Sequence, residues 1–183
     1  MARPQRIWFP GATFHVEASG LKNAPLFCDR KDYAHYLFLL SKHKLRENFD
    51  IHAYALLPKK VHLLIETVTE EISSLIQRLH TSYAMYYNRR HKQSGHVFNG
   101  RFVSQLILDE THFFETSRII HLTPLEEKPK EDISSYRWCS ARDYLSPQPE
   151  GDPPHPVLSL DRTLSPFPHP KHQAFQKFLN LIS

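Results

Sequence analysis

Residues 53–66 read AYALLPKKVHLLIE, and the fold can be worked out from this stretch outward. Two largely apolar runs, Ile51–Leu57 and Val61–Thr67, flank the polar stop Pro58-Lys59-Lys60. Two short runs of this kind around a turn predict a β-hairpin. Because both runs are apolar rather than alternating, we expect them to be covered on at least one face and central in a sheet. The second run opens with a lone histidine, His62.

The segments before the hairpin predict one strand and one helix. Thr13–Ser19 alternates between apolar and polar residues, as a strand does, and Gly20 closes it. Asp29 is a candidate N-cap for a helix running to about Glu47. The apolar residues of this helix fall on one face, which predicts that the helix packs on a sheet.

The segments after the hairpin repeat the alternation. Thr69 is a candidate cap for a second helix with two glutamates in its positive first turn. Phe102–Leu108 follows as a strand, and Asp109 begins a third helix. We expect this helix to end near Leu122, because Pro124 follows.

The order of these elements predicts an α+β fold of the ferredoxin-like, split βαβ type. Strand, helix, strand, strand, helix and strand bury one face of an antiparallel sheet under two helices. The terminal helix is the natural cover for the other face, which is otherwise available for binding. Residues 1–145 form this domain. Residues 146–183 form a tail. Eight of the 14 prolines lie between Pro147 and Pro170, which predicts an extended linker or a disordered segment, and a short amphipathic helix follows.

Composition indicates a soluble globular protein of 183 residues, 40% hydrophobic and 23% charged. No apolar run approaches the roughly 20 residues that span a bilayer. The opening MARPQRIWFPG has no apolar signal core, so we expect a cytoplasmic protein that does not act on membranes. Cys28 and Cys139 stand alone in the sequence, which argues against a disulfide framework and a zinc knuckle.

Charge is distributed unevenly along the chain. Between Glu71 and Asp109 there is no acidic residue, and aromatic residues are interleaved with cations. Cations for phosphates and flat rings for unstacked bases are what a surface for single-stranded nucleic acid needs. The alternative is that the tyrosines are core residues and the arginines are solvated. The cations of this stretch are Arg78, Arg89, Arg90, Lys92 and Arg101.

Six strings in order resemble the REP-associated tyrosine transposases of bacteria, which are single-tyrosine HUH transposases. WFPGATFHVEASG is similar to the opening strand of that family, CDRKDYAHYLFLL to its first helix and AYALLPKKVHLLIET to its HUH hairpin. LHTSYAMYYNRRHKQSGHVFNGRF is similar to the basic helix and loop, SRIIHLTPLEEKP to the terminal helix and YRWCSARDYL to the closing segment. The resemblance spans roughly residues 7–145.

The resemblance implies a site for cutting single-stranded DNA. In that family a His-hydrophobic-His pair holds Mg²⁺ or Mn²⁺ on the scissile phosphate, and a tyrosine of the terminal helix attacks it. Here the second histidine of the pair is His62, but the first is Lys60, preceded by Lys59. The tyrosine position is Ile119, and the polar metal-binding position one turn later is Thr123.

These replacements predict a disabled site with no intact catalytic residue and no cofactor. Isoleucine has no nucleophilic atom, and Lys60 places a positive charge where the metal ion would sit. At about 4 Å this repulsion is on the order of several kcal/mol even at an effective dielectric near 20. His62 is then a vestigial ligand, a phosphate contact or a plain hairpin histidine. Lys60 is either a phosphate contact or a solvated turn residue.

The leading hypothesis is a transposase-like protein that binds single-stranded or hairpin DNA without cutting it. Both a monomer and a dimer fit this hypothesis, and so does a protein associated with the nucleoid. The first alternative is an active transposase or nuclease that uses Tyr83, Tyr86 or Tyr87. The second is a module that binds RNA hairpins. The predicted nucleic-acid contacts are Lys59, Lys60, Arg78, Arg89, Arg90, Lys92 and Arg101.

Overall fold

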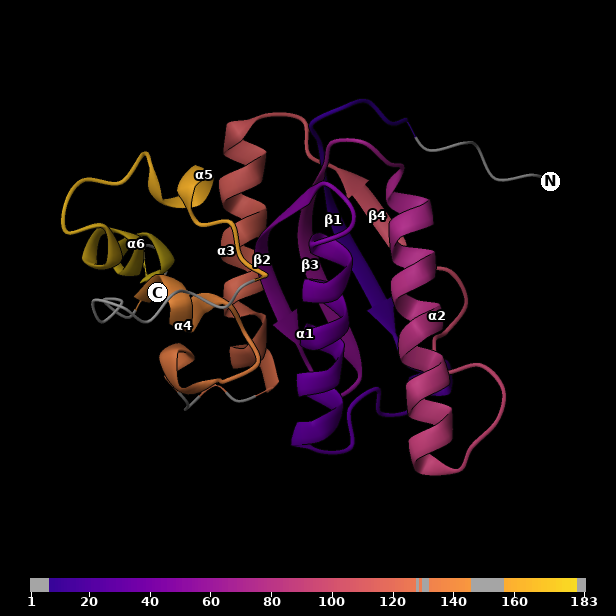
Figure 1. Cartoon of the computed structure of the whole chain (residues 1–183). Helices are drawn as coiled ribbons and strands as arrows, with labels where there is room; N and C mark the ends of the chain where they lie inside the picture. Colours follow the sequence, from indigo (N-terminus) through magenta and orange to yellow (C-terminus); the bar gives the residue numbers. More distant parts are fainter. Residues whose placement is uncertain (1–6, 128, 130–131, 146–156, 181–183) are drawn as a thin grey trace.

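The computed structural model describes residues 7–127, 129, 132–145 and 157–180. The strands are β1 (Ala12–Ser19), β2 (Phe49–Leu56), β3 (Lys60–Thr67) and β4 (Val103–Leu106), in one antiparallel sheet of order β2-β3-β1-β4. The helices are α1 (Arg30–Lys44), α2 (Ile72–His91), α3 (Glu110–Glu127), α4 (Ala141–Leu145), α5 (Asp161–Leu164) and α6 (Lys171–Asn180), with 3-10 turns η1 (Leu21–Asn23) and η2 (Ile133–Ser135). This order is the split βαβ pattern, so the predicted α+β fold is confirmed (Figure 1).

The hairpin of β2 and β3 forms as predicted, but only β3 is central in the sheet. The strand β2 lies at the edge, beyond β3. Its free edge is covered because later segments bridge to it, Leu158 to Ile51 and Cys139 to Ala55. This cover explains why a continuous apolar run is stable at an edge, where exposed backbone groups would otherwise recruit another strand.

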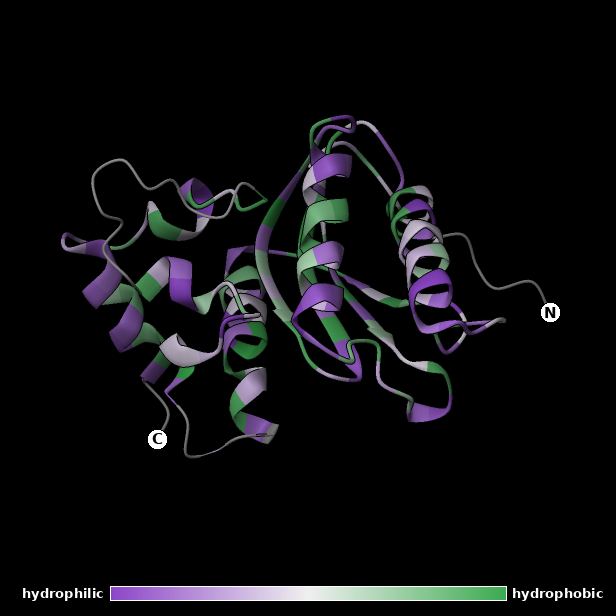
Figure 2. Cartoon of the chain, turned by 60° about the horizontal axis from the view of Figure 1, so that its bottom comes forward, coloured by the Kyte–Doolittle hydropathy of each residue, from purple (hydrophilic) through white to green (hydrophobic). Residues whose placement is uncertain are grey.

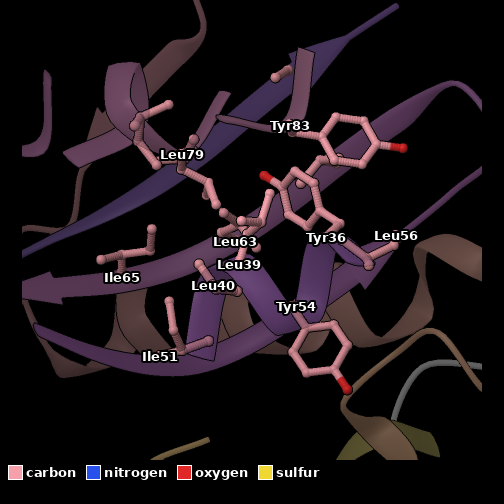
Figure 3. Packing of buried hydrophobic residues seen from close by; sticks show 14 of the residues in the cluster. Tyr36, Leu39, Leu40, Ile51, Tyr54, Leu56, Leu63, Ile65, Leu79 and Tyr83 are labelled. Carbon is pink, nitrogen blue, oxygen red and sulfur yellow. The ribbon is translucent and has the colours of Figure 1, made fainter. Parts of the chain in front are cut away.

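The helices α1 and α2 cover one face of the sheet and enclose the main core. Asp29 caps α1 as predicted, since its side chain accepts hydrogen bonds from the backbone N–H groups of Lys31 at 2.8 Å and Asp32 at 3.4 Å. Tyr36 and Tyr83 meet edge to face between the two helices, with ring centroids 5.1 Å apart. Figure 3 shows these rings over the leucines and isoleucines of β2 and β3. Each large apolar side chain that is fully buried here contributes about 1.5–3 kcal/mol.

The helix α2 starts later than the sequence indicated. Its N-cap is Glu71, without a side-chain capping bond, so the expected cap at Thr69 is wrong. The glutamates before the helix have another role, since Glu70 pairs with Arg78 two turns into α2. This ion pair ties the approaching chain to the outer face of the helix.

The helix α3 covers the opposite face of the sheet, against β2 and β3, as expected for the terminal helix (Figure 1). Phe113 is fully buried there, and His121 packs inside the fold with Nε2 2.8 Å from the Ser140 hydroxyl. The predicted end at Leu122 is wrong, because α3 continues through Pro124. A proline in a last turn removes only one backbone donor, and burial of Pro124 offsets that loss.

The tail is packed from Val157 onward rather than extended as a linker. Val157 and Leu158 enter the main core, and the Lys44 ammonium donates to the Val157 carbonyl at 3.0 Å. Phe175 of α6 packs against Tyr144 of α4, with ring centroids 4.9 Å apart. In Figure 2, hydrophobic and hydrophilic residues alternate along the ribbons of the helices, as they do in a helix that buries one face. Residues 146–156, where much of the proline-rich stretch lies, are outside the described part of the chain.

None of the helices described is long and apolar enough to cross a membrane.

Candidate nucleic-acid interface

The sheet face under α3 carries a group of polar side chains at one end. His15 and Glu17 of β1 lie beside Lys60 and His62 of β3, because alternate residues of a strand point to the same face. The register pairs Glu17 directly with His62. All four side chains are titratable, and each lies within hydrogen-bond or ion-pair distance of another member of the group.

His62 is buried, with 8% of its side chain exposed. Its Nδ1 lies 3.2 Å from Nε2 of His15 and 3.7 Å from Oε2 of Glu17, whereas Nε2 is buried with no hydrogen-bond partner in the described part of the chain. Burial, more than any charge, lowers the pKa of His62 to about 4, and burial also lowers the pKa of His15. Both imidazoles are therefore neutral at pH 7.

Lys60 opens β3 with half of its side chain exposed. Its Nζ lies 3.8 Å from Oε1 of Glu17, a loose ion pair at the surface. Such a pair is weak, on the order of 1 kcal/mol or less, so the ammonium can exchange Glu17 for a phosphate. The same geometry puts a fixed positive charge two residues before His62.

On α3, Ile119 and Thr123 share one face at a spacing of four residues. The Ile119 side chain is 57% exposed, which is uncommon for so apolar a residue. Thr123 is buried and donates its hydroxyl proton to the Ile119 carbonyl at 2.7 Å. The helix therefore presents an inert side chain to solvent at the position where the family resemblance implies a tyrosine.

The divalent cation implied by the resemblance does not fit Lys60, His62 and Thr123. Lys60 offers a protonated ammonium, which is no ligand, and the free nitrogen of His62 is enclosed without contact to solvent. The Thr123 hydroxyl is engaged by its own helix. Mg²⁺ and Mn²⁺ prefer several oxygen ligands in an open site, and these residues supply neither the ligands nor the access.

Five of the predicted cations gather at one end of the molecule, which we call the basic end. It comprises the turn between β2 and β3, the last turn of α2 and the segment after it. Backbone hydrogen bonds join these parts through Gly20, whose N–H donates to the Lys59 carbonyl at 3.0 Å, and through Asn99, whose N–H donates to the Ser19 carbonyl at 2.8 Å. The turn between β2 and β3 and the end of α2 lie at the lower end of Figure 1, and the segment after α2 runs from there up the right side of the view toward β4. The exposed cations of the basic end are Lys59, Lys60, Arg89, Lys92 and Arg101.

Gly20 is the pivot of this end. A Cβ at this position would lie 1.9 Å from the carbonyl oxygen of Ala24, so no other residue fits without moving the backbone. The Gly20 backbone N–H donates to the Lys59 carbonyl, and Gly20 also forms a β-bridge with Phe98. The glycine therefore holds the basic end together.

Two of the predicted contacts are engaged elsewhere. Arg78 donates to both carboxylate oxygens of Glu47, at 3.1 and 2.8 Å, and to one carboxylate oxygen of Glu70. Arg90 bonds Asp29 and the buried Asp32. Arg78 also sits in the first half of α2, well before the last turn of the helix. The sequence pattern did not reveal these ion pairs because the acidic partners lie in other segments.

A pocket of about 600 Å³ adjoins the basic end, between α2 and the segment after it. Its walls combine aromatic rings with a few polar groups. His80 stacks on Phe98 with ring centroids 3.9 Å apart, and burial lowers the pKa of His80 to about 3, so this ring is neutral. The lining includes Ile76, Gln77, His80, Phe98, Arg101 and Phe102.

Sequence reasoning missed the partners of His62 on β1. The strand alternation of Thr13–Ser19 already placed His15 and Glu17 on one face, and this signal could have found them. It also missed the meeting of Cys28, Asp32 and His91, which lie close together in the structure. Only the spacing of four between Cys28 and Asp32, around the cap of α1, hinted at this second group.

Comparison with solved structures shows which known fold the chain adopts. The chain is similar to the structure of a REP-associated tyrosine transposase bound to a REP hairpin, with 15% identity and a TM-score of 0.67. The match covers 87% of this chain and 92% of that chain. A likeness at this identity establishes the fold, which is that of the transposases the sequence resembles.

A second match is a candidate transposase from Deinococcus radiodurans R1, with 15% identity and a TM-score of 0.44 over 64% of this chain and 95% of that chain. No protein-family model matches the chain, and neither does any curated protein.

Proposed function

We propose that this chain binds single-stranded or hairpin DNA at its basic end and does not cut it. The observation that carries the proposal is the gathering of Lys59, Lys60 and Arg101 by backbone hydrogen bonds around Gly20. These three exposed cations come from two separate segments that backbone hydrogen bonds hold together. Positive charges held in fixed positions suit the regularly spaced phosphates of a nucleic-acid backbone.

The fold supports a DNA ligand. The similar REP-associated transposase is bound to a REP hairpin. A hairpin offers a paired stem and unpaired bases, and the basic end has a feature for each. The exposed cations suit stem phosphates, and the pocket beside Arg101, with neutral His80 and polar Gln77 among aromatic rings, has the character that an unpaired base requires.

The absence of cutting follows from the residues at the reaction positions. Exposed Ile119 has no group that can attack a phosphate, and the Lys60 ammonium stands where the metal ion of the family would be held. Lys60 can still neutralise a phosphate as a fixed charge. Binding and cutting therefore separate, because binding needs the cations alone.

The enzyme alternative has no support from the tyrosines of α2. Tyr83 and Tyr87 are buried, and their hydroxyls donate to the carbonyls of Leu26 and Pro25. Tyr86 donates to the Lys31 carbonyl. All three face α1 and the segment before it, on the opposite side of the sheet from His62. Burial raises the pKa of each phenol, which makes a phenolate nucleophile less accessible.

The RNA alternative rests on aromatic side chains on an open sheet face. That face carries His15, Glu17 and His62 rather than large aromatics, and α3 lies over β2 and β3. DNA is therefore the favoured ligand, and a matched RNA hairpin is the competitor to test.

The test is an incubation of the protein with a labelled palindromic single strand and Mg²⁺ or Mn²⁺, divided between native and denaturing gels. We expect a shift on the native gel at low salt and neither adduct nor cleavage on the denaturing gel. A Lys59→Ala/Arg101→Ala variant should lose the shift, whereas Lys177→Ala, which removes one exposed positive charge on α6, should keep it. No shift at low salt, or a covalent adduct, would overturn the proposal. An RNA hairpin that competes better than DNA would reassign the ligand.

A further inference from the structure

The side chains of Cys28, Asp32 and His91 converge at the junction of α1 and α2. Cys28 Sγ, a carboxylate oxygen of Asp32 and a ring nitrogen of His91 all lie within 4.8 Å of one another. Thiolate, imidazole and carboxylate are the ligand types of zinc, with bonds of about 2.0–2.3 Å. Donor atoms around one zinc ion are then less than about 4 Å apart, so small side-chain rotations complete the set.

The folded backbone holds these ligands together from distant segments. Cys28 lies just before the Asp29 cap, Asp32 lies in the first turn of α1, and His91 is the last residue of α2. The Cys28 backbone N–H donates to Oδ2 of Asp32 at 2.8 Å. Nε2 of His91 lies 3.0 and 3.2 Å from the two Asp32 oxygens. A metal ion would replace the proton between His91 and Asp32.

The charges at this junction suit a divalent cation. Asp32 is fully buried, and Asp29 lies beside it, with the guanidinium of Arg90 between them. With a Cys28 thiolate, three negative charges face Arg90, and a divalent ion brings the group to neutrality. Arg90 stays anchored when Asp32 turns to the metal, because its NH1 also donates to Asp29 Oδ1 at 2.9 Å.

The surroundings meet two further requirements of a zinc site. The Tyr87 hydroxyl lies 3.3 Å from Cys28 Sγ, and it would orient the thiolate by turning its proton from the Pro25 carbonyl to the sulfur. Cys28 is exposed, which leaves a fourth position open to water. From these features we propose that Cys28, Asp32 and His91 form a binding site for Zn²⁺ that ties the start of α1 to the end of α2 at the basic end.

Co²⁺ tests this proposal directly because it reports its ligands by absorption. Titration of the reduced full-length protein with Co²⁺ alone should give a near-ultraviolet sulfur-to-cobalt charge-transfer band and strong visible bands of tetrahedral cobalt. Added Zn²⁺ should displace them. Cys28→Ser should abolish the charge-transfer band, and His91→Asn should weaken affinity on the order of tenfold or more.

Cys139 provides the matched control, since it is the other cysteine of the chain and is buried on the far side of the sheet. The charge-transfer band should persist in Cys139→Ala. No band in the wild-type protein, or a band that survives Cys28→Ser, would overturn the proposal. Because Cys28 is exposed, its variant should fold, and circular dichroism checks this. The readout is independent of DNA, so the outcome bears on the zinc site alone.

Discussion

His15 and His62 face each other across β1 and β3, with 3.2 Å between Nε2 of His15 and Nδ1 of His62. Two neutral imidazoles at this distance share one proton, so one ring donates and the other accepts. The pair stacks with ring centroids 5.5 Å apart. The His62 ring thus faces His15 on β1 rather than Lys60, which lies two residues earlier on its own strand. The lone histidine of the hairpin has become part of a cross-strand contact.

Lys60 and Ile119, at the two reaction positions that the family resemblance implies, predict what restored cutting would require. Lys60→His alone supplies a second imidazole but no nucleophile, and Ile119→Tyr alone supplies a phenol but no metal pair. We expect no covalent adduct from either single variant and an adduct only from the double variant with Mn²⁺, since both functions are needed together. Denaturing gels with a labelled palindromic strand give the measurement. An adduct from the Ile119→Tyr variant alone would contradict the expectation that Lys60 blocks the metal.

The cations of the basic end should determine the salt dependence of binding. Each phosphate contact contributes about 0.7–0.9 to the slope of log affinity against log salt. Arg101→Ala and Lys59→Ala should each reduce the slope by about that amount, and the double variant by about twice as much. Fluorescence anisotropy over a salt series measures it, with Lys177→Ala as control. A slope that is unchanged in the double variant would place the DNA elsewhere.

Arg78 should contribute to stability rather than to binding. Its guanidinium is held by Glu47 and Glu70 and is 41% exposed, so the network contributes on the order of 1 kcal/mol or less. We expect Arg78→Ala to lower the free energy of unfolding by that small amount and to leave the affinity for a DNA hairpin unchanged. Urea unfolding and anisotropy measure the two effects. A loss of affinity as large as that of Arg101→Ala would show that Arg78 leaves its acidic partners to bind DNA.

The sequence predicts those features of the structure that depend on residues close together in the chain. Local patterns gave the strands, the Asp29 cap and the hairpin, because alternation and capping act within a few residues. The cap of α2 and the end of α3 were misplaced, since Glu70 pairs with Arg78 and burial of Pro124 offsets its missing donor. Cys28 and His91 are 63 positions apart in the sequence, so their convergence depends on tertiary packing and no local pattern predicts it.

Acid should destabilise the protein through His80. Burial lowers its pKa from 6.5 to about 3, so between these values the unfolded chain binds more protons than the folded one. Stability therefore falls as the pH falls below 6.5, by about 2 kcal/mol between pH 7 and pH 5 for this residue. His80→Gln keeps a polar group near the Tyr36 hydroxyl, which lies 3.2 Å from Nε2, but does not titrate. Urea unfolding at both pH values should show a smaller pH effect in this variant, and an equal effect would contradict the assignment.

The docking of the tail should depend on Phe175. This side chain is fully buried between Tyr144 and Phe167, with ring centroids 4.9 and 5.4 Å away. Truncation to alanine typically costs about 3–5 kcal/mol at such a site. Because these contacts join the tail to α3, through His121, and to α4 rather than to the main core, we expect Phe175→Ala to release α6 while the sheet stays folded.

Limited proteolysis distinguishes release of the tail from global unfolding. Cleavage in and just before α6 should accelerate strongly in Phe175→Ala, whereas α1, α2 and the sheet should stay resistant, because the buried residues of the Phe175 cluster (Tyr144, Phe175 and Leu179) are not part of the main core. Gln176→Ala, the neighbouring exposed position, is the control and should be cut as slowly as the wild type. Equal cleavage in the two variants would mean that Phe175 does not hold the tail. Simultaneous loss of the main core would mean that tail and sheet unfold as one cooperative unit.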